Sequence, residues 1–297
     1  MKIAINKHLE PYLDVDTLRV AGLSLTGFAA IMFVMAALLL PPAKPIPLED
    51  VISIRKSVPV GSLAQADMKP MNNAEDSIAG MHESSPYGLL PIKTANGTSI
   101  FESYRQKFIP ATANAETFSL VFYDVGLSET LTITALESLP RMTTLLISPY
   151  ANNAQNLISQ ARAKGFEVWL FLPLEAANQT QNDGGEKTLR SDAGLETNEK
   201  NLLQILGIGT GYTGIITNKD NVFIKNEAAF KPINDILQTR GVKLIEADVS
   251  GFEFKAPDNT ADIIFVPLSH GSLKASTEWL SSRAQSAELA PLSHQLQ

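Results

Sequence analysis

The sequence contains no cysteine, which excludes disulfide bonds, thiolate catalysis and cysteine-ligated metal sites. Histidine is also scarce: the chain has four, and none lies between His82 and His270. The other two are His8 and His294. Basic residues are outnumbered, since 24 Lys and Arg stand against 31 Asp and Glu, for a net charge of −7. Because no basic patch stands out, we expect no nucleic-acid partner.

One long apolar run lies near the N-terminus, at residues 20–40, and it carries no charge. At about 1.5 Å per residue it is long enough for a hydrocarbon core of about 30 Å. We predict a signal anchor in the inner (cytoplasmic) membrane, with residues 1–19 as a short cytoplasmic tail and the C-terminal domain in the periplasm. Lys2, Lys7 and Arg19 precede the run and favour this orientation. A cleaved signal peptide and a buried core segment are the alternatives.

Residues 41–85 are predicted to be a flexible linker, because PPAKPIP is followed by a stretch rich in Ser, Ala, Asn, Asp and Met with little periodicity. Residues 86–297 are predicted to form the folded domain. Its first part, residues 86–110, mixes aromatic residues with turn signals such as Asn96-Gly97 and is expected to pack on the domain surface.

From residue 117 onward, short apolar runs alternate with helical patterns, which predicts an α/β fold with a parallel sheet covered on both faces. Seven such runs suit either an open doubly wound sheet or an incomplete (β/α) barrel. The predicted strands are 117–123, 143–147, 167–172, 214–217, 242–246, 262–266 and 288–292. The predicted helices begin near Ser128 and span 153–164 (capped by Asn152 or Asn153), 195–206, 227–239 (capped by Asn226) and 272–285.

Polar residues gather where these strands end, and the carboxyl edge of a parallel sheet is where such folds bind ligands. We predict a cleft that includes Asp124 and Glu175 as candidate catalytic residues. The predicted ligand-binding residues are Tyr123, Tyr150, Asp183, Asn218, Lys219 and Asp220. The alternative for each is a turn or cap role, because Asp, Asn and Ser are common in strand-to-helix loops. Glu246 and Asp248 also follow a strand.

The chain resembles the divergent polysaccharide deacetylases of Gram-negative bacteria over about residues 84–297. The resemblance is carried by the order and spacing of several motifs rather than by one of them. They are SPYGLLPI, IFESY, VFYDVGLSETLT, LLISPYANN, ARAKGFEVWLFLPLEA, NDGGEKTL, YTGIITN and RGVKLIEAD. The resemblance implies a distorted seven-stranded (β/α) barrel, held in the periplasm by an N-terminal anchor.

The resemblance also implies a divalent metal held by an aspartate and two histidines, with a second aspartate to activate water. This sequence departs from that pattern. At the aspartate pair it has Tyr123 and Asp124, and at three family histidine positions it has Phe166, Phe171 and Lys219. Zinc sites need at least three protein ligands, so we predict that no metal or other cofactor is bound.

Two hypotheses follow. In the first, the domain is non-catalytic and binds a glycan of the peptidoglycan type or another envelope protein. In the second, it is an active hydrolase that removes acetyl groups from an N-acetylated polysaccharide through Asp124 and Glu175. That hydrolase would use zinc or magnesium. The sequence leaves open whether the protein is an enzyme.

Overall fold

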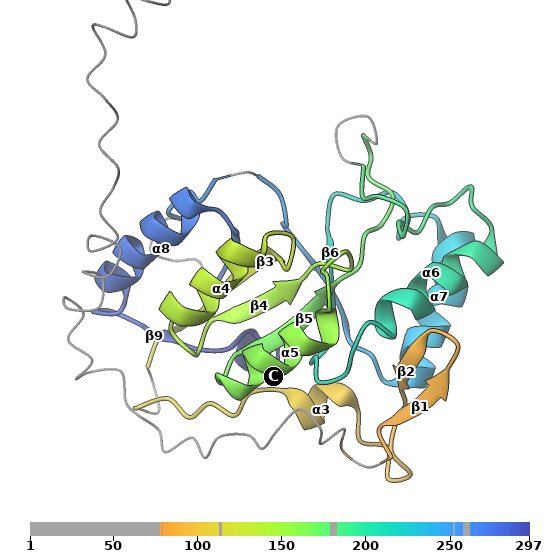
Figure 1. Ribbon diagram of the computed structural model, residues 1–297, viewed down its shortest axis with the longest axis horizontal. Helices are drawn as coiled ribbons and strands as arrows, with labels where there is room; N and C mark the ends of the chain where they lie inside the picture. Colours follow the sequence, from red (N-terminus) through yellow and green to blue (C-terminus); the bar gives the residue numbers. More distant parts are fainter. Residues whose placement is uncertain (1–77, 79, 113–114, 179–182, 252, 258–261) are drawn as a thin grey trace, which may run out of the picture. The chain divides into compact units, whose positions relative to one another are not determined.

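The computed structural model describes residues 78, 80–112, 115–178, 183–251, 253–257 and 262–297 (Figure 1). The strands are β1 (His82–Ser85), β2 (Gly88–Pro91), β3 (Thr117–Val125), β4 (Thr144–Ile147), β5 (Glu167–Phe171), β6 (Ile215–Asn218), β7 (Leu244–Ala247), β8 (Ile263–Pro267) and β9 (Glu288–Leu289). The helices are α3 (Ile100–Tyr104), α4 (Glu129–Ser138), α5 (Ala154–Ala163), α6 (Leu195–Leu206), α7 (Glu227–Arg240), α8 (His270–Arg283) and the 3₁₀ helix η3 (Leu292–Leu296).

The central sheet of the described region has seven strands, all parallel, in the order β7-β6-β5-β4-β3-β8, with β9 paired to the start of β3. The seven predicted strands are therefore confirmed. The sheet is a curled half-barrel rather than a closed ring, because within the described residues no pairing joins β7 to β8. Its carboxyl edge carries the loops in which the candidate site residues lie.

Side chains along each strand point alternately to the two faces of the sheet, and each face has its own apolar core. Leu145 and Leu170 point to the helix-covered face, where they pack in one cluster with Ile158 of α5. Leu146 and Trp169, one residue away along the same strands, point to the inner face of the half-barrel and form a second cluster. The period of two in a strand explains this division. Trp169 is fully buried there, so its truncation to Ala should cost roughly 3–5 kcal/mol.

The C-terminal segment runs past the amino ends of the strands. Leu292 packs in the inner cluster, and its backbone N–H donates to Thr144 Oγ1 over 2.9 Å. The N–H of Ser293 donates to the fully buried carboxylate of Glu167 over 3.0 Å. Glu167 also accepts from Trp169 Nε1 at 2.9 Å and from the N–H of Gln106 at 3.0 Å. One carboxylate thus joins the lead-in segment, the sheet and the C-terminus.

Several predicted boundaries differ from the structure. Residues 82–85, assigned to the end of the linker, form β1, which pairs antiparallel with β2. This hairpin packs against α6 through β2, and Arg240 Nη1 at the end of α7 lies 2.8 Å from Glu83 Oε1. Strand β9 ends at Leu289 rather than at residue 292, because Pro291 cannot donate to a ladder.

The helix predictions hold with local corrections. Helices α6 and α7 start where predicted, and Asn226 caps α7 by accepting from the N–H of Ala229 at 3.3 Å. Asn153 precedes α5, but its side chain makes no cap hydrogen bond and its backbone is left-handed, with φ of 51°. Helix α8 begins at His270, two residues before its predicted start, because Ser269 caps it.

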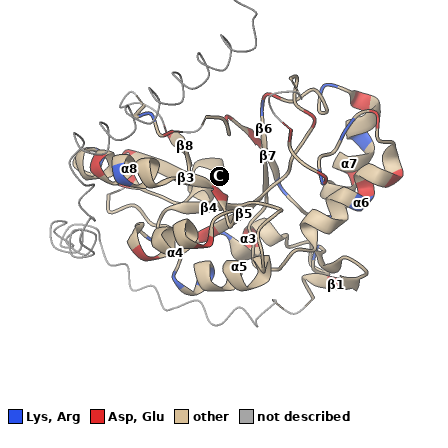
Figure 2. Cartoon of the chain, turned by 45° about the horizontal axis from the view of Figure 1, so that its top comes forward, with Lys and Arg blue, Asp and Glu red and all other residues tan. Residues whose placement is uncertain are grey.

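The predicted cytoplasmic tail at residues 1–19, the anchor at residues 20–40 and most of the linker lie outside the described residues. Among the described residues, each helix falls short of the length and apolar character that a membrane crossing requires. Figure 2 shows acidic and basic residues interspersed along α6, α7 and α8.

Candidate functional site

The carboxyl end of β3 makes a sharp, constrained turn. Asp124 adopts a left-handed backbone with φ of 62°, and the pairing with β4 shifts register between Phe122 and Val125. This is the pattern of a β-bulge, a distortion that re-aims a side chain. A positive φ at a residue other than glycine is uncommon and is concentrated at functional sites. The exposed carboxylate of Asp124 is therefore placed at the edge of the sheet by a distorted backbone.

The turn after Asp124 is fixed by its neighbours. Gly126 has φ of 95°, and a Cβ added there would lie 2.4 Å from the Cβ of Ala151 in the next loop. The N–H of Gly126 donates to Thr132 Oγ1 over 3.0 Å. Although the Asp124 side chain is exposed, the surrounding strand ends remove enough water to raise its pKa above the usual value.

Tyr123 points the other way, into the half-barrel, and is almost fully buried. Its hydroxyl lies 2.9 Å from the carbonyl oxygen of Ser250 and 2.7 Å from that of Gly251, and it donates to this pair. Burial, followed by the charges of Asp124 and Asp248, raises the pKa of Tyr123. The phenol therefore stays protonated and holds the segment that follows β7.

That segment, residues 248–251, is also held from β6. Asn218 Nδ2 donates to the carbonyl oxygen of Val249 over 3.1 Å. Lys219 Nζ lies 2.9 Å from Asp248 Oδ2, and the two side chains are 60% and 58% exposed. A hydrogen bond from Ser250, and then one from Lys219, lower the pKa of Asp248. Asn218 Oδ1 accepts from the N–H of Asp220 at 3.1 Å, so these predicted site residues form one connected rim.

Tyr150 lies on the β4–α5 loop, and the residue is 38% exposed. Its hydroxyl donates to the carbonyl oxygen of Gly184 over 2.7 Å and accepts from the N–H of Lys187 at 2.9 Å. Lys187 Nζ lies 5.5 Å from the ring centroid and donates to the carbonyl oxygen of Pro149. Asp183 accepts from the N–H of Gly185, which shapes the same turn. The Tyr150 side chain is thus held in place through its hydroxyl while the residue stays exposed.

Glu175 has a structural connection to the long loop after β5. Its Oε2 accepts from the N–H of Ser191 at 2.7 Å, and its backbone pairs with Leu189 and Val222. Strand β4 lies between β3, which carries Asp124, and β5, which Glu175 follows in the next loop. The described residues show no hydrogen bond between these two carboxylates, so the structure does not join the predicted catalytic residues.

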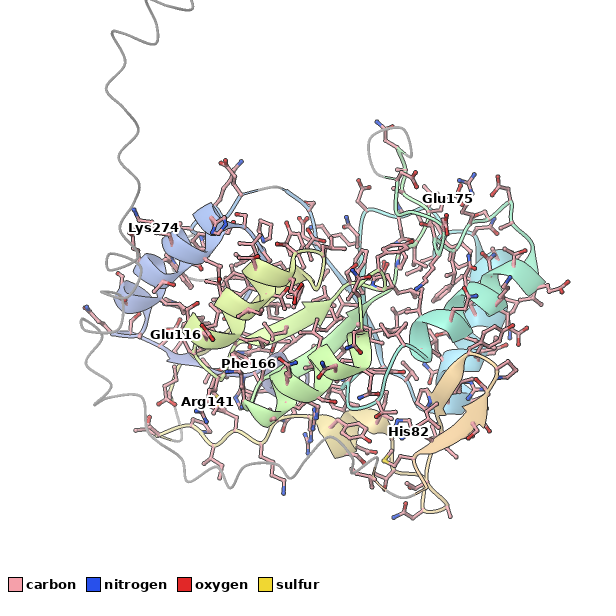
Figure 3. All side chains as sticks on the ribbon, in the orientation of Figure 1. His82, Glu116, Arg141, Phe166, Glu175 and Lys274 are labelled. Atoms are coloured by element: carbon pink, nitrogen blue, oxygen red, sulfur yellow. The ribbon has the colours of Figure 1, made fainter. Side chains whose placement is uncertain are left out.

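Of the described histidines, His82 and His294 lie apart from this edge, and His270 follows the carboxyl end of β8. His82 is in the hairpin, half-buried beside Tyr104, and Figure 3 shows it well away from Glu175. His270 is exposed at the start of α8, and His294 packs edge-on against Phe108. Among the described residues, no three His, Asp or Glu side chains gather closely enough to hold a metal ion.

The central part of the chain is similar to a known protein family. Residues 120–261 match the sequence model of the divergent polysaccharide deacetylases. This match confirms the resemblance over that region of the chain. A solved structure of an uncharacterized protein from Agrobacterium tumefaciens C58 superposes with a TM-score of 0.62 at 22% identity, covering 70% of this chain and 99% of the other. It shares the fold. No curated protein matches the chain.

The residues present do not fit the metal that the family resemblance implies. Tyr123 directs its hydroxyl to backbone carbonyls, and Phe171 packs in the inner apolar cluster. Phe166 is buried in the helix-side core, where Figure 3 labels it. Lys219 brings a cation that is paired with Asp248. A phenyl ring has no lone pair to donate, and an ammonium repels a metal ion.

Two parts of this edge were not among the predicted site residues. No sequence pattern predicts that Lys187 belongs to the site, because its contacts with Tyr150 depend on how its loop folds. The segment 248–251 gave a partial signal, since Asp248 follows a strand. Its hydrogen bonds to Tyr123 and Asn218 come from strands far away in the sequence.

Proposed function

We propose that this protein is a non-catalytic member of its family that binds a glycan strand of the peptidoglycan type at the carboxyl edge of the half-barrel. One observation carries the proposal. Tyr123 stands at the aspartate pair that the resemblance implies, Phe171 and Lys219 stand at two of its histidine positions, and each is engaged in a contact of its own. The contacts of Tyr123 and Lys219 hold the segment 248–251 across the edge, which serves binding and stability rather than water activation.

The glycan assignment rests on Tyr150 and its polar surroundings. A sugar ring packs its apolar face on an aromatic side chain while its hydroxyls hydrogen-bond to carboxylates and amides. Tyr150 offers such a ring, held by Gly184 and Lys187, so little conformational freedom is lost on binding. Asp124 and Asp220 supply exposed carboxylates along the same edge.

We further propose that residues 20–40 anchor the protein in the inner membrane and that the domain faces the periplasm. Peptidoglycan lies in that compartment, so location and ligand agree. Another envelope protein is the second kind of partner that this edge would suit, through the exposed ring of Tyr150 and the exposed Leu127.

The test uses the full chain in detergent and N-acetylglucosamine oligomers. Binding is measured by calorimetry, and released acetate is measured in parallel. We expect binding without acetate release, and a roughly tenfold weaker affinity for Tyr150→Ala, about 1.4 kcal/mol. Leu195→Ala, an exposed apolar side chain on α6, is the matched control and should leave the affinity unchanged.

The alternative is the active hydrolase, favoured by the raised pKa of Asp124, since a general base works best with a pKa near the working pH. Acetate release that stops in Asp124→Asn would establish that alternative and end the non-catalytic proposal. Absence of any oligomer binding in the wild type would remove the glycan assignment.

A further inference from the structure

Strand β7 ends the sheet and leaves one side of its backbone unpaired among the described residues. The N–H of Ile215 donates to the carbonyl oxygen of Lys243 over 2.9 Å, and that of Lys219 donates to Ala247 over 2.7 Å. Alternate residues of the strand therefore face β6. The N–H and C=O groups of Leu244 and Glu246 point to the other side, where the order of the sheet places no further strand.

A cavity of about 450 Å³ runs along this unpaired edge. Leu244 lines it from β7, Val242 from the turn before that strand, Phe230 and Asn234 from α7, and Phe101 from α3. Pockets that hold ligands usually have volumes of about 300–1,000 Å³. The cavity lies beside the amino-terminal half of β7 and the turn before it, and it shares neither Tyr150 nor Tyr123 with the proposed glycan edge.

Some charged side chains around the cavity already have partners within the domain, and others make no ion pair within the described residues. Lys243 Nζ lies 4.1 Å from the centroid of the Phe101 ring and donates to the carbonyl oxygen of Leu296. Glu102 accepts from the N–H and hydroxyl of Ser99. Glu246 and Lys93 are exposed and make no ion pair within the described part of the chain. Glu246 lies on the strand itself and Lys93 lies off it.

We propose that an extended segment of a partner protein adds a strand to β7 in this groove. A backbone edge with alternating donors and acceptors is complementary to another extended backbone, and peptide addition to a free edge is a recurring mode of recognition. Leu244 and Glu246 share one face of the sheet because side chains alternate along a strand. The partner segment presents an apolar residue beside Leu244 and Phe230. Two positions away it presents a Lys or Arg beside Glu246.

The first measurement is hydrogen–deuterium exchange on the full chain in detergent, without a partner. We expect the amides of Leu244 and Glu246 to exchange faster than those of Ile245 and Ala247, which face β6. Equal protection of all four amides would mean that another part of the chain already covers the edge, and this would overturn the proposal.

The second measurement uses a positional-scanning library of capped heptapeptides, read by fluorescence polarisation against the same protein. We expect selection of an apolar residue and a Lys or Arg two positions apart, with dissociation constants in the micromolar range typical of weak complexes, about 1–100 μM. Binding should slow the exchange of the Leu244 and Glu246 amides. A library in which no peptide binds more tightly than about 1 mM overturns the proposal.

Reversing the charge of Glu246 tests whether the peptide binds in this groove rather than on another surface. In Glu246→Lys the library should select Asp or Glu where the wild type selects Lys or Arg. Glu199→Lys, an exposed substitution on α6, should keep the wild-type preference. An unchanged preference in Glu246→Lys overturns the proposal. So does displacement of the peptide by N-acetylglucosamine oligomers, which would assign the groove to glycan. Neither result bears on glycan binding at Tyr150, which is tested separately.

Discussion

The hydroxyl of Tyr123 lies 2.7 Å from the carbonyl oxygen of Gly251 and joins β3 to the segment that follows β7. Strands β3 and β7 are not neighbours in the sheet, since β4, β5 and β6 lie between them. This contact therefore spans the inside of the half-barrel at its carboxyl end. Where the resemblance implies an aspartate beside the reacting water, the chain uses a phenol as a structural link.

Removing that link should loosen the edge. We expect Tyr123→Phe to lower the free energy of unfolding by about 1–2 kcal/mol, because the carbonyls of Ser250 and Gly251 lose their donor. Denaturant unfolding measures this change, and hydrogen exchange in residues 248–251 should become faster. Tyr87→Phe is the control, since the Tyr87 hydroxyl makes no hydrogen bond within the described residues. Equal unfolding free energies for the two variants would contradict the assigned role of Tyr123.

Asp124 should make stability depend on pH in a definite direction. Its pKa is raised in the folded protein, so the folded state binds its proton more tightly than the unfolded state does. Stability therefore falls as the pH rises from the ordinary carboxyl range through the raised pKa. We expect Asp124→Asn to have a higher melting temperature than the wild type at pH 7. The part of this gain that comes from the charge should vanish near pH 3.

A pH titration of the melting temperature checks this expectation for Asp124. Asn also tolerates the left-handed backbone at this position, so a constant gain at all pH values would come from the backbone alone. Such a constant gain would contradict the electrostatic argument. Asp220→Asn, which changes an exposed acid just after β6, is measured over the same pH range for comparison.

Glu167 should be the most sensitive carboxylate in the domain. It is fully buried and accepts from Gln106, Trp169 and Ser293. In Glu167→Gln an amide NH₂ faces at least one of these donors, so we expect a loss of about 2 kcal/mol or more in unfolding free energy. Glu137→Gln, an exposed change on α4, should stay within about 0.5 kcal/mol. Comparable losses in both variants would remove the special role of Glu167.

Gly126→Ala tests the turn that places Asp124. The added Cβ would lie 2.4 Å from the Cβ of Ala151, and φ is 95°, so we expect a loss of about 1–3 kcal/mol. Gly271→Ala at the start of α8 meets nothing closer than 4.0 Å and should leave stability nearly unchanged. The melting temperatures of the two variants give the comparison. A neutral Gly126→Ala would mean that the β3–α4 turn is adaptable.

The sheet was predictable from sequence because its strands are short, apolar runs rich in β-branched residues, and the helices between them carry clear caps such as Ser128 and Asn226. The β1–β2 hairpin was missed because HESS and GLLP show no alternation of apolar and polar residues. It is held by packing of β2 against α6 and by the ion pair between Glu83 and Arg240, rather than by its own pattern.

The site was predictable only in part. The position of Asp124 at a strand end follows from local sequence, and the structure confirms that it lies on the carboxyl edge. The contacts of its neighbour Tyr123 are made with residues more than a hundred positions away, which no local pattern specifies. Glu175 illustrates the same limit, because its hydrogen bond to Ser191 depends on how the long loop folds back.

The route of residues 288–296 also bears on how the protein is made. Strand β9 pairs with β3, and the backbone N–H groups of Leu292 and Ser293 donate to side chains of β4 and β5. The first strands of the sheet therefore complete their contacts only with a segment some 150 residues further along the chain. During synthesis the inner core cannot be completed until that segment has left the ribosome. If the domain folds in the periplasm, we expect its core to close after translocation rather than during it, with an interval in which Trp169 and Leu146 are open to chaperones.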